Sequence, residues 1–416
     1  MVKTLPKVVQ RFIKYVKYDT QSAYESDSYP STSKQLVLLK DLEEELKEIG
    51  LKDVYMDEYG YVFGILPANV KGDIPKIGFL AHVDTTPEMT GKNVNPQVVE
   101  NYNGNDIILN EEKNIVLSPK KSPELKDYIG DTLITTDGMT LLGADDKAGV
   151  AEIVTAMEYL IEHPEIPHGT VKVAFTPDEE VGRGVIHFDI KKFDVDFAYT
   201  LDGGTIGEII YETFNAAIAK VVVNGNNVHP GLAKGKMVNA IEVLMELNSM
   251  LPVSEKPQYT EGREGYFHLL IINGDADRVD ASFYIRDHNR EKFESRKDLM
   301  EKAAEFINIK YGENTIKMNI EDEYYNMADV LKDYMHIVKT AEKAVKEVGL
   351  EPLYTAMRGG TDGAWLTYAG LPTPNISFGG HNLHGRYEYI PVRSMEKGTE
   401  IVVKIVELYG KGEQVR

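Results

Sequence analysis

The first half of the chain alternates helix-like and strand-like hydrophobic patterns. Apolar residues recur every three or four positions from Leu36 to Gly50, which predicts an amphipathic helix ended by the glycine. A similar pattern predicts a helix over 147–162. Runs rich in β-branched and aromatic residues predict strands at 61–66, 77–81, 170–175 and 196–201, with a loop-rich segment over 84–140. This alternation predicts an α/β domain with a central, mostly parallel sheet.

The pattern changes after Asp202-Gly203-Gly204. Strands are predicted at 216–223, 267–272 and 281–287, and helices at 239–250, 299–311 and 336–348. Up to residue 326 these elements give β-α-β-β-α, which a closing strand would complete to the β-α-β-β-α-β order of an inserted ferredoxin-like α+β module. We therefore expect a first domain in two parts, 1–212 and 327–416, around an inserted domain at 213–326.

Two adjacent glutamates, Glu179 and Glu180, follow the strand predicted at 170–175. Side chains at strand ends face the cleft where α/β proteins usually bind ligands. Two ionised carboxylates repel each other, and a cation beside them removes that cost. One glutamate could therefore hold a metal ion while the other transfers a proton. By itself, a Glu-Glu pair is also typical of an acidic surface turn.

Four further clusters change that interpretation. His82 and Asp84 lie on the same side of a strand, so the Asp84 carboxylate can accept the second imidazole N–H. The other candidates are the Asp145-Asp146 pair before a helix, Asp202 after a strand, and His384 in a late glycine-rich segment. A His-x-Asp pair can be purely structural, and an Asp-Asp pair can cap a helix. Together, these nitrogen and oxygen donors suit a pair of divalent ions of the zinc type.

Composition narrows the class of protein. A chain of 416 residues predicts two domains. The absence of cysteine excludes disulfides and thiolate metal ligands. A net charge of −20 argues against nucleic acid and anionic membranes as partners. The stretch 1–7 lacks the apolar core of a signal peptide, and no 18-residue apolar span occurs, so a cytoplasmic protein is expected.

The order of these motifs resembles the co-catalytic dizinc M20 metallopeptidases. The resemblance runs nearly end to end, and its segments at 225–231 and 358–364 point to the tripeptide-aminopeptidase branch. The motifs that carry it are His82-x-Asp84, Gly143-x-Asp145-Asp146-Lys147-x-Gly149, Pro177-Asp178-Glu179-Glu180-Val181-Gly182, Asp202-Gly203-Gly204, Arg358-Gly359-Gly360-Thr361-Asp362-Gly363 and His384-Gly385. The implied fold is a zinc-peptidase-like catalytic domain with a lid or dimerisation domain inserted into it.

The resemblance implies two Zn²⁺ per chain, with Co²⁺ or Mn²⁺ as alternatives. His82 and Asp202 would hold one ion, Glu180 and His384 the other, and Asp145 would bridge both. Asp84 would orient His82. Glu179 would be the general base that takes a proton from water and passes it to the departing amine. The implied activity is release of the amino-terminal residue from short peptides, and the resemblance favours tripeptides.

Three more residues are candidates for substrate contacts. His229 in the inserted domain reads as a turn histidine from its surroundings, whereas the resemblance implies that it polarises the scissile carbonyl. Arg286 could pair with the carboxylate of the substrate, although a surface salt bridge is the alternative. Arg358, before two glycines, could do likewise. The resemblance also allows a homodimer.

Site chemistry alone leaves other functions open. An M20-type dipeptidase or an N-acyl amino acid deacylase would need the same metals and the same base. A metal-binding or peptide-binding protein without activity is a further alternative. Glu179 argues against it, because a binding protein has no need of a general base beside the ligand Glu180.

Overall fold

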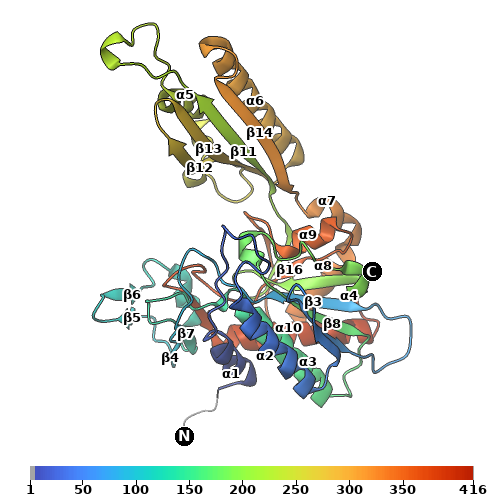
Figure 1. The fold of residues 1–416 in the computed structure, drawn as a ribbon. Coiled ribbons are helices and arrows are strands. Elements are labelled where there is room, and N and C mark those ends of the chain that lie inside the picture. Colours follow the sequence, from blue (N-terminus) through green and yellow to red (C-terminus); the bar gives the residue numbers. More distant parts are fainter. Residues whose placement is uncertain (1–4, 416) are drawn as a thin grey trace. The chain divides into compact units, whose positions relative to one another are not determined.

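The computed structural model describes residues 5–415 and divides the chain into two compact units (Figure 1). The first unit comprises the chain up to Tyr211, Val330–Thr355 and the chain from Thr361 on, and the second comprises Glu212–Asp329 and Ala356–Gly360. None of the helices within 5–415 is both long and apolar enough to cross a membrane. Of the stretch 1–7 considered above for a signal peptide, residues 1–4 lie outside the described part.

An eight-stranded mixed sheet forms the centre of the first unit. Its strands in spatial order are β1 (Lys52–Met56), β2 (Val62–Leu66), β8 (Val171–Thr176), β3 (Ile77–His82), β9 (Phe197–Leu201), β16 (Asn375–Ile376), β10 (Glu208–Glu212) and β15 (Leu353–Ala356). The central strands β8, β3, β9 and β16 pair in parallel, whereas β1, β2 and β10 pair antiparallel. The predicted α/β class is confirmed. The carboxyl ends of β8, β3 and β9 therefore meet at one edge of the sheet.

Helices cover both faces of this sheet. The helices are α1 (Lys7–Tyr15), α2 (Gln35–Ile49), α3 (Ala144–Glu162), α4 (Ile190–Phe193), α7 (Ala328–Leu331), α8 (Met335–Glu347), α9 (Asp362–Tyr368) and α10 (Val392–Gly410). The helix α3 contacts β3 as well as α1 and α10, and every residue from Ala144 to Met157 is buried. On the other face, Phe193 of α4 and Leu366 of α9 join one apolar cluster with Leu80 of β3.

The segment expected to be loop-rich contains short strands. One small sheet has the order β17 (Tyr389–Pro391), β7 (Leu133–Thr135) and β4 (Gln97–Val99), and β5 (Ile107–Asn110) pairs with β6 (Ile115–Leu117). Leu125, Tyr128 and Tyr389 are buried together in a separate cluster. Strands of three or four residues are too short for a hydrophobic alternation to reveal them.

The second unit is a four-stranded antiparallel sheet with two helices packed against it (Figure 1). The strand order is β12 (Tyr266–Gly274), β13 (Arg278–Asp287), β11 (Asn215–Asn224) and β14 (Ile316–Tyr324), and the helices are α5 (Ala240–Met250) and α6 (Arg290–Tyr311). The helix α6 begins well before the predicted residue 299. The side chain of Asn289 caps it by accepting from the Lys292 N–H, and its polar first turns carry no hydrophobic period.

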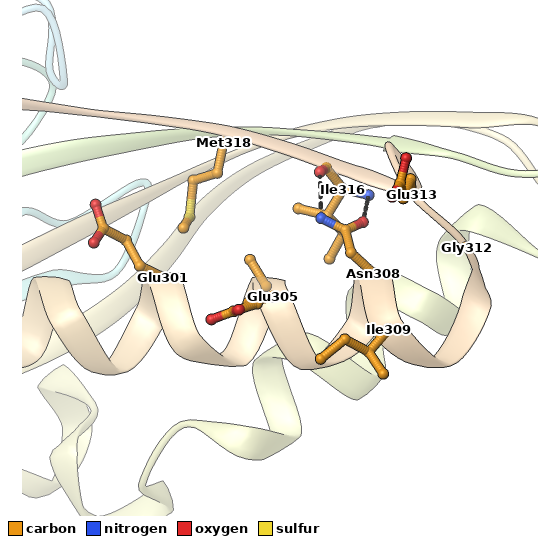
Figure 2. A pocket seen from close by; sticks show the side chains of 9 residues that line it. Glu301, Glu305, Asn308, Ile309, Gly312, Glu313, Ile316 and Met318 are labelled. Atoms are coloured by element: carbon orange, nitrogen blue, oxygen red, sulfur yellow. Dashed lines mark hydrogen bonds between the residues drawn. The ribbon is translucent and has the colours of Figure 1, made fainter.

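A surface hollow of about 630 Å³ lies between α6 and β14 (Figure 2). Its lining includes the carboxylates of Glu301, Glu305 and Glu313. The side chain of Asn308 is hydrogen-bonded to both backbone groups of Ile316, which ties the helix to the strand. The lining of this hollow includes no histidine, so the three glutamates do not form a mixed nitrogen and oxygen ligand set.

Candidate metal centre

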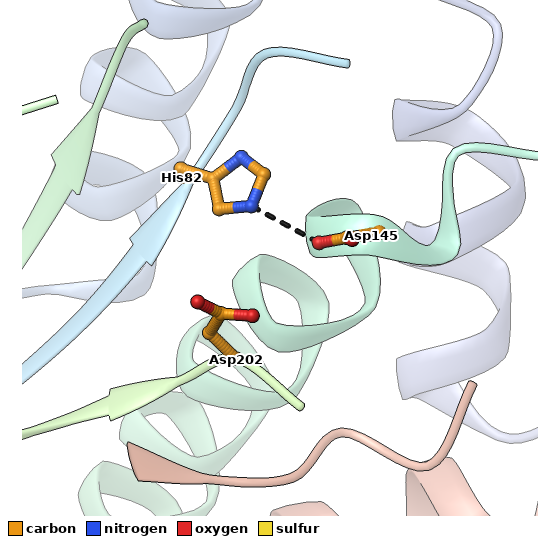
Figure 3. A group of neighbouring side chains, drawn as sticks. All are labelled: His82, Asp145 and Asp202. Atoms are coloured by element: carbon orange, nitrogen blue, oxygen red, sulfur yellow. Dashed lines mark hydrogen bonds and ion pairs between the residues drawn. The ribbon is translucent and has the colours of Figure 1, made fainter. Parts of the chain in front are cut away.

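Five predicted ligands of the first unit come together in two groups that share Asp145. We call His82, Asp145 and Asp202 the inner half-site, and Asp145, Glu180 and His384 the outer half-site. In each group, one ligand atom per residue lies within 4.8 Å of the others. Figure 3 shows the inner half-site, where His82 ends β3, Asp145 opens α3 and Asp202 follows β9.

Asp145 faces both histidines with different oxygens. Its Oδ1 lies 3.0 Å from His82 Nε2, and its Oδ2 lies 3.3 Å from His384 Nε2. Asp145 and Asp146 both have non-helical backbone angles. The capping contact belongs to Asp146, whose Oδ1 accepts from the backbone N–H of Gly149. Asp145 therefore remains available to both half-sites.

Asp84 is fully buried and contacts two parts of the site. Its Oδ1 lies 3.3 Å from His82 Nδ1, and its backbone carbonyl lies 3.2 Å from the same nitrogen. Its carboxylate also accepts hydrogen bonds from the backbone N–H groups of Glu179 and Glu180, at 3.0 and 3.2 Å. One side chain thus links the end of β3 to the turn that carries both glutamates.

Asp178 also holds the turn that carries Glu179 and Glu180. No role was predicted for it from the sequence. Its carboxylate accepts from the backbone N–H of Ser31 at 2.6 Å and from the amide of Gln35 at 2.7 Å. Asp178 has a φ of 60°, a left-handed conformation that is uncommon outside glycine. These bonds fix the backbone just before Glu179. Its position in the Pro-Asp-Glu-Glu motif was the only available signal.

The outer half-site is more open to solvent at its histidine. His384 Nε2 lies 3.0 Å from Glu180 Oε2, and its Nδ1 lies 3.6 Å from Glu88. The side chain of His384 is 37% exposed, against 3% for His82. The second oxygen of Glu180, Oε1, is buried without a hydrogen-bond partner. A buried carboxylate oxygen is costly unless a donor or a cation faces it, so this atom fits a metal ligand.

Acidic side chains dominate the centre, so its charge suits a bound cation. Burial and the neighbouring Asp145 raise the pKa of Glu180 to about 8 and that of Asp202 to about 6. Against the effect of burial, the carboxylates of Asp145 and Glu180 raise the pKa of His384 to about 12. These carboxylates crowd together in a buried space, and divalent cations between them would relieve the repulsion.

Glu179 lies beside the inner half-site without belonging to either ligand group. Its Oε2 is 4.0 Å from His82 Nε2. Burial, together with nearby Asp202 and Asp362, raises the pKa of Glu179 well above its usual value, although His82 opposes the shift. A carboxylate next to the ligands and outside their groups is suited to proton transfer.

Glu388 anchors the loop before Asp145. This role of Glu388 was not predicted from the sequence. Its carboxylate accepts from four consecutive backbone N–H groups, those of residues 142–145, at 2.6 to 3.2 Å. Burial raises the pKa of Glu388 to about 7. The segment that supplies His384 therefore also fixes the approach to Asp145. A glutamate four residues after a candidate ligand gives no sequence signal of this role.

The three candidates for substrate contacts belong to the second unit. His229 is exposed, and its Nδ1 accepts a backbone N–H within its own turn, η3 (Pro230–Leu232). Arg286 on β13 donates to the hydroxyl of Tyr324. Arg358 donates to two backbone carbonyls and to the hydroxyl of Thr260. All of these contacts lie within the second unit.

Comparisons with known proteins add a family. The model of "Peptidase family M20/M25/M40" matches residues 135–408. A curated relative named peptidase T from Halothermothrix orenii is 58% identical over 405 residues, covering 97% of this chain and 99% of the relative. Peptidase T from Bacillus subtilis is 54% identical over 403 residues, covering 97% of this chain and 98% of the relative.

Two solved structures share the fold. A tripeptidase from Staphylococcus aureus has a TM-score of 0.78 at 22% identity, and aminopeptidase PepT from Bacillus cereus has a TM-score of 0.76 at 24% identity. Each comparison covers 97% of this chain and 98% of the other. The similarity therefore extends over both units of the chain.

Proposed function

The chain belongs to the Peptidase family M20/M25/M40 and is a metallo-aminopeptidase, and we propose that it releases the amino-terminal residue of tripeptides. The observation that carries the proposal is the pair of half-sites that share Asp145, with Glu179 beside them. Relatives named peptidase T, at 54% to 58% identity, favour this activity over a dipeptidase or a deacylase. A protein that only binds metal would have no use for Glu179.

We propose that each half-site holds one ion and that Asp145 bridges them. His82 and Asp202 would complete the inner set, and Glu180 and His384 the outer set. Imidazole and carboxylate donors suit Zn²⁺, with Co²⁺ or Mn²⁺ as alternatives. When bound, two such ions supply Lewis acidity and lower the pKa of water toward about 7.

Glu179 acts as the general base in this proposal. Its carboxylate takes a proton from the attacking water and delivers it to the departing amine. Asp84 has two tasks, because it orients His82 and also accepts from the backbone N–H of Glu179. The base and a ligand are thereby held by one buried carboxylate, which keeps their geometry fixed during the reaction.

We propose that residues of the second unit bind the peptide. The Nδ1 of His229 accepts a backbone N–H, so in the neutral ring Nε2 carries the proton and can donate to the scissile carbonyl. Arg286 and Arg358 are the candidates for the carboxylate of the substrate. Arg358 makes three hydrogen bonds within the unit. Arg286 donates to Tyr324 and lies 3.4 Å from Glu323, but its buried Nε has no hydrogen-bond partner. Arg286 is therefore the stronger candidate.

The test of the activity is a peptide series with metal analysis of the same sample. A tripeptide with a free amino terminus should give the highest kcat/KM, and the protein should carry two ions per chain. An N-acetylated tripeptide should resist hydrolysis, because an aminopeptidase needs the free amine. Preferred hydrolysis of a dipeptide or an N-acyl amino acid would replace this proposal with one of the alternatives.

The role of Arg286 is tested by removing the charge of the substrate. Amidating the carboxyl terminus of a tripeptide should lower kcat/KM strongly in the wild type. In Arg286→Ala the free and amidated peptides should become nearly equal, while the control Arg358→Ala should still discriminate. Undiminished discrimination in Arg286→Ala together with its loss in Arg358→Ala would transfer the role to Arg358.

We also propose a homodimer formed through the second unit. Its edge strand β12 exposes three consecutive apolar residues, Leu270, Ile271 and Ile272. An open, apolar sheet edge is a ready surface for strand pairing. Sedimentation analysis should show a dimer, and Ile271→Lys should shift it toward the monomer. The cytoplasmic location and the exclusion of nucleic acid and membranes stay predictions from the sequence.

A further inference from the structure

The hydroxyl of Thr361 contacts the inner half-site. Its Oγ1 lies 2.9 Å from Oδ2 of Asp202. Thr361 is almost fully buried, with 2% of its surface exposed. It belongs to the Arg-Gly-Gly-Thr-Asp-Gly motif, in which the proposed function so far uses only Arg358. The partner Asp202 is a proposed ligand, so a buried hydroxyl meets a buried carboxylate beside the metal centre.

The position of Thr361 in the chain makes this contact unusual. Thr361 precedes α9 as its N-cap residue, where a threonine ordinarily accepts a backbone N–H of the first turn. Its side chain makes no capping hydrogen bond. Threonine is therefore not present here to stabilise the helix. Its hydroxyl serves Asp202 instead.

Asn375 fixes the direction of this hydrogen bond. Its Nδ2 donates to the backbone carbonyl of Asp202 at 3.0 Å and to Thr361 Oγ1 at 2.9 Å, and it makes a longer contact of 3.4 Å with Asp202 Oδ2. A backbone carbonyl can only accept, so the orientation of the amide is determined. Because Thr361 Oγ1 accepts from Asn375, its single proton is free to be donated to the Asp202 carboxylate.

The fold holds Asn375 in place for this task. Strand β16 pairs in parallel with β9, with Asn375 opposite Thr200, two residues before Asp202. A Cβ on Gly363 would lie only 2.6 Å from Asn375 Oδ1, so the glycine of the motif leaves room for the amide. The Arg-Gly-Gly-Thr-Asp-Gly motif therefore supplies both the hydroxyl of Thr361 and, through Gly363, the space for Asn375.

We propose that Thr361, supported by Asn375, is a positioning residue that fixes the Asp202 carboxylate for metal binding. The hydrogen bond occupies Oδ2 and leaves Oδ1 to ligate the ion of the inner half-site. This inference rests on the proposed ligand role of Asp202. Such supporting contacts to metal ligands typically change metal affinity by about 10–100-fold.

The experiment measures zinc affinity at the inner half-site alone. In a His384→Ala background, where the outer half-site lacks a ligand, Zn²⁺ is titrated against a chelator of known affinity. Adding Thr361→Val, which keeps the shape but removes the hydroxyl, should weaken zinc binding by about 10–100-fold. Adding Thr361→Ser, which keeps the hydroxyl, should leave it unchanged. In the otherwise native chain, excess zinc should restore much of the kcat lost in Thr361→Val.

The outcomes separate this inference from the proposed function. Equal zinc affinity with Val and Ser at position 361 would overturn the role of Thr361 and leave the half-sites untouched. A His384→Ala protein that binds no zinc would refute the inner half-site itself and the inference with it. Melting of the metal-free proteins controls for folding. If Thr361→Val has a lower Tm than the parent protein, Thr361→Ala makes the same comparison, because alanine also lacks the hydroxyl and is smaller than valine.

Discussion

The inner and outer half-sites share Asp145 but differ in what surrounds their histidines. His82 ends a central strand and is 3% exposed, with the fully buried Asp84 behind its Nδ1. His384 comes from a loop and is 37% exposed, and the carboxylate facing its Nδ1 is Glu88, which is 60% exposed. Buried partners restrict a ligand's orientation more than exposed ones do. We expect a rigid inner half-site and a more adaptable outer one.

The support of the other ligands follows the same division. Asp202 of the inner half-site is held by Thr361 and Asn375. Glu180 of the outer half-site is held through its backbone by Asp84, while its buried Oε1 lacks a hydrogen-bond partner. This difference suggests that the candidate metal centre combines one preorganised set of side chains with one that is held less firmly.

The largest effect should come from the residue common to both half-sites. Asp145→Ala would remove the proposed bridging ligand, so both ions should bind weakly and activity should fall to the background of the assay. Metal content after gel filtration and kcat with a tripeptide measure the two losses. Two tightly held ions in this variant would show that the half-sites do not depend on a shared carboxylate.

Glu179→Gln should separate proton transfer from metal binding. It removes the base but no ligand, so kcat should fall by about 10²–10⁴-fold while both ions are retained. Glu179→Asp is the matched control, since it keeps the acid on a shorter side chain and should recover part of the rate. Turnover near that of the wild type in Glu179→Gln would remove the residue from the mechanism.

Replacing each histidine in turn tests the asymmetry directly. His82→Ala leaves Asp84 and Asp145 buried without a shared partner, which should lower the free energy of unfolding of the metal-free protein by about 1–3 kcal/mol. His384→Ala also removes a partner of Asp145 and Glu180, but the side chain lost is more exposed, so the destabilisation should be smaller than in His82→Ala. Each variant should lose one ion. Equal destabilisation by the two changes would contradict the division into rigid and adaptable halves.

The smallest effects should come from the carboxylates behind the histidines. Asp84→Asn weakens the contact with His82 and with the Glu179 turn, so metal affinity or kcat should fall by about 10–100-fold. Glu88→Gln alters an exposed contact of 3.6 Å and should have little effect on either. Zinc competition and tripeptide kinetics on both variants make the comparison. A larger loss in Glu88→Gln would reverse the assignment of which histidine is held more firmly.

Many of the elements and the types of donor atom could be predicted from the sequence. Hydrophobic periods predicted β2, β3, β8, β9 and α3 closely, whereas β16 was not predicted. Strand ends beside glycines identified His82, Glu179, Glu180 and Asp202 as candidates. These features are local, because the hydrophobic period and the residues that form a turn depend on a few neighbouring positions. The strands of 84–140 and the early start of α6 escaped prediction for the same reason, since they have too few residues or too little hydrophobic contrast.

Which residues meet, and what supports them, depends on the tertiary structure. The contact of Asp84 with the Glu179 turn and the anchoring of residues 142–145 by Glu388 depend on segments far apart in the chain. The same holds for Asn375, which reaches Asp202 because β16 lies beside β9, and for Thr361, which precedes the helix α9 that contacts β9. A hydrogen bond needs two atoms within about 3 Å, and sequence spacing does not encode that distance across a fold.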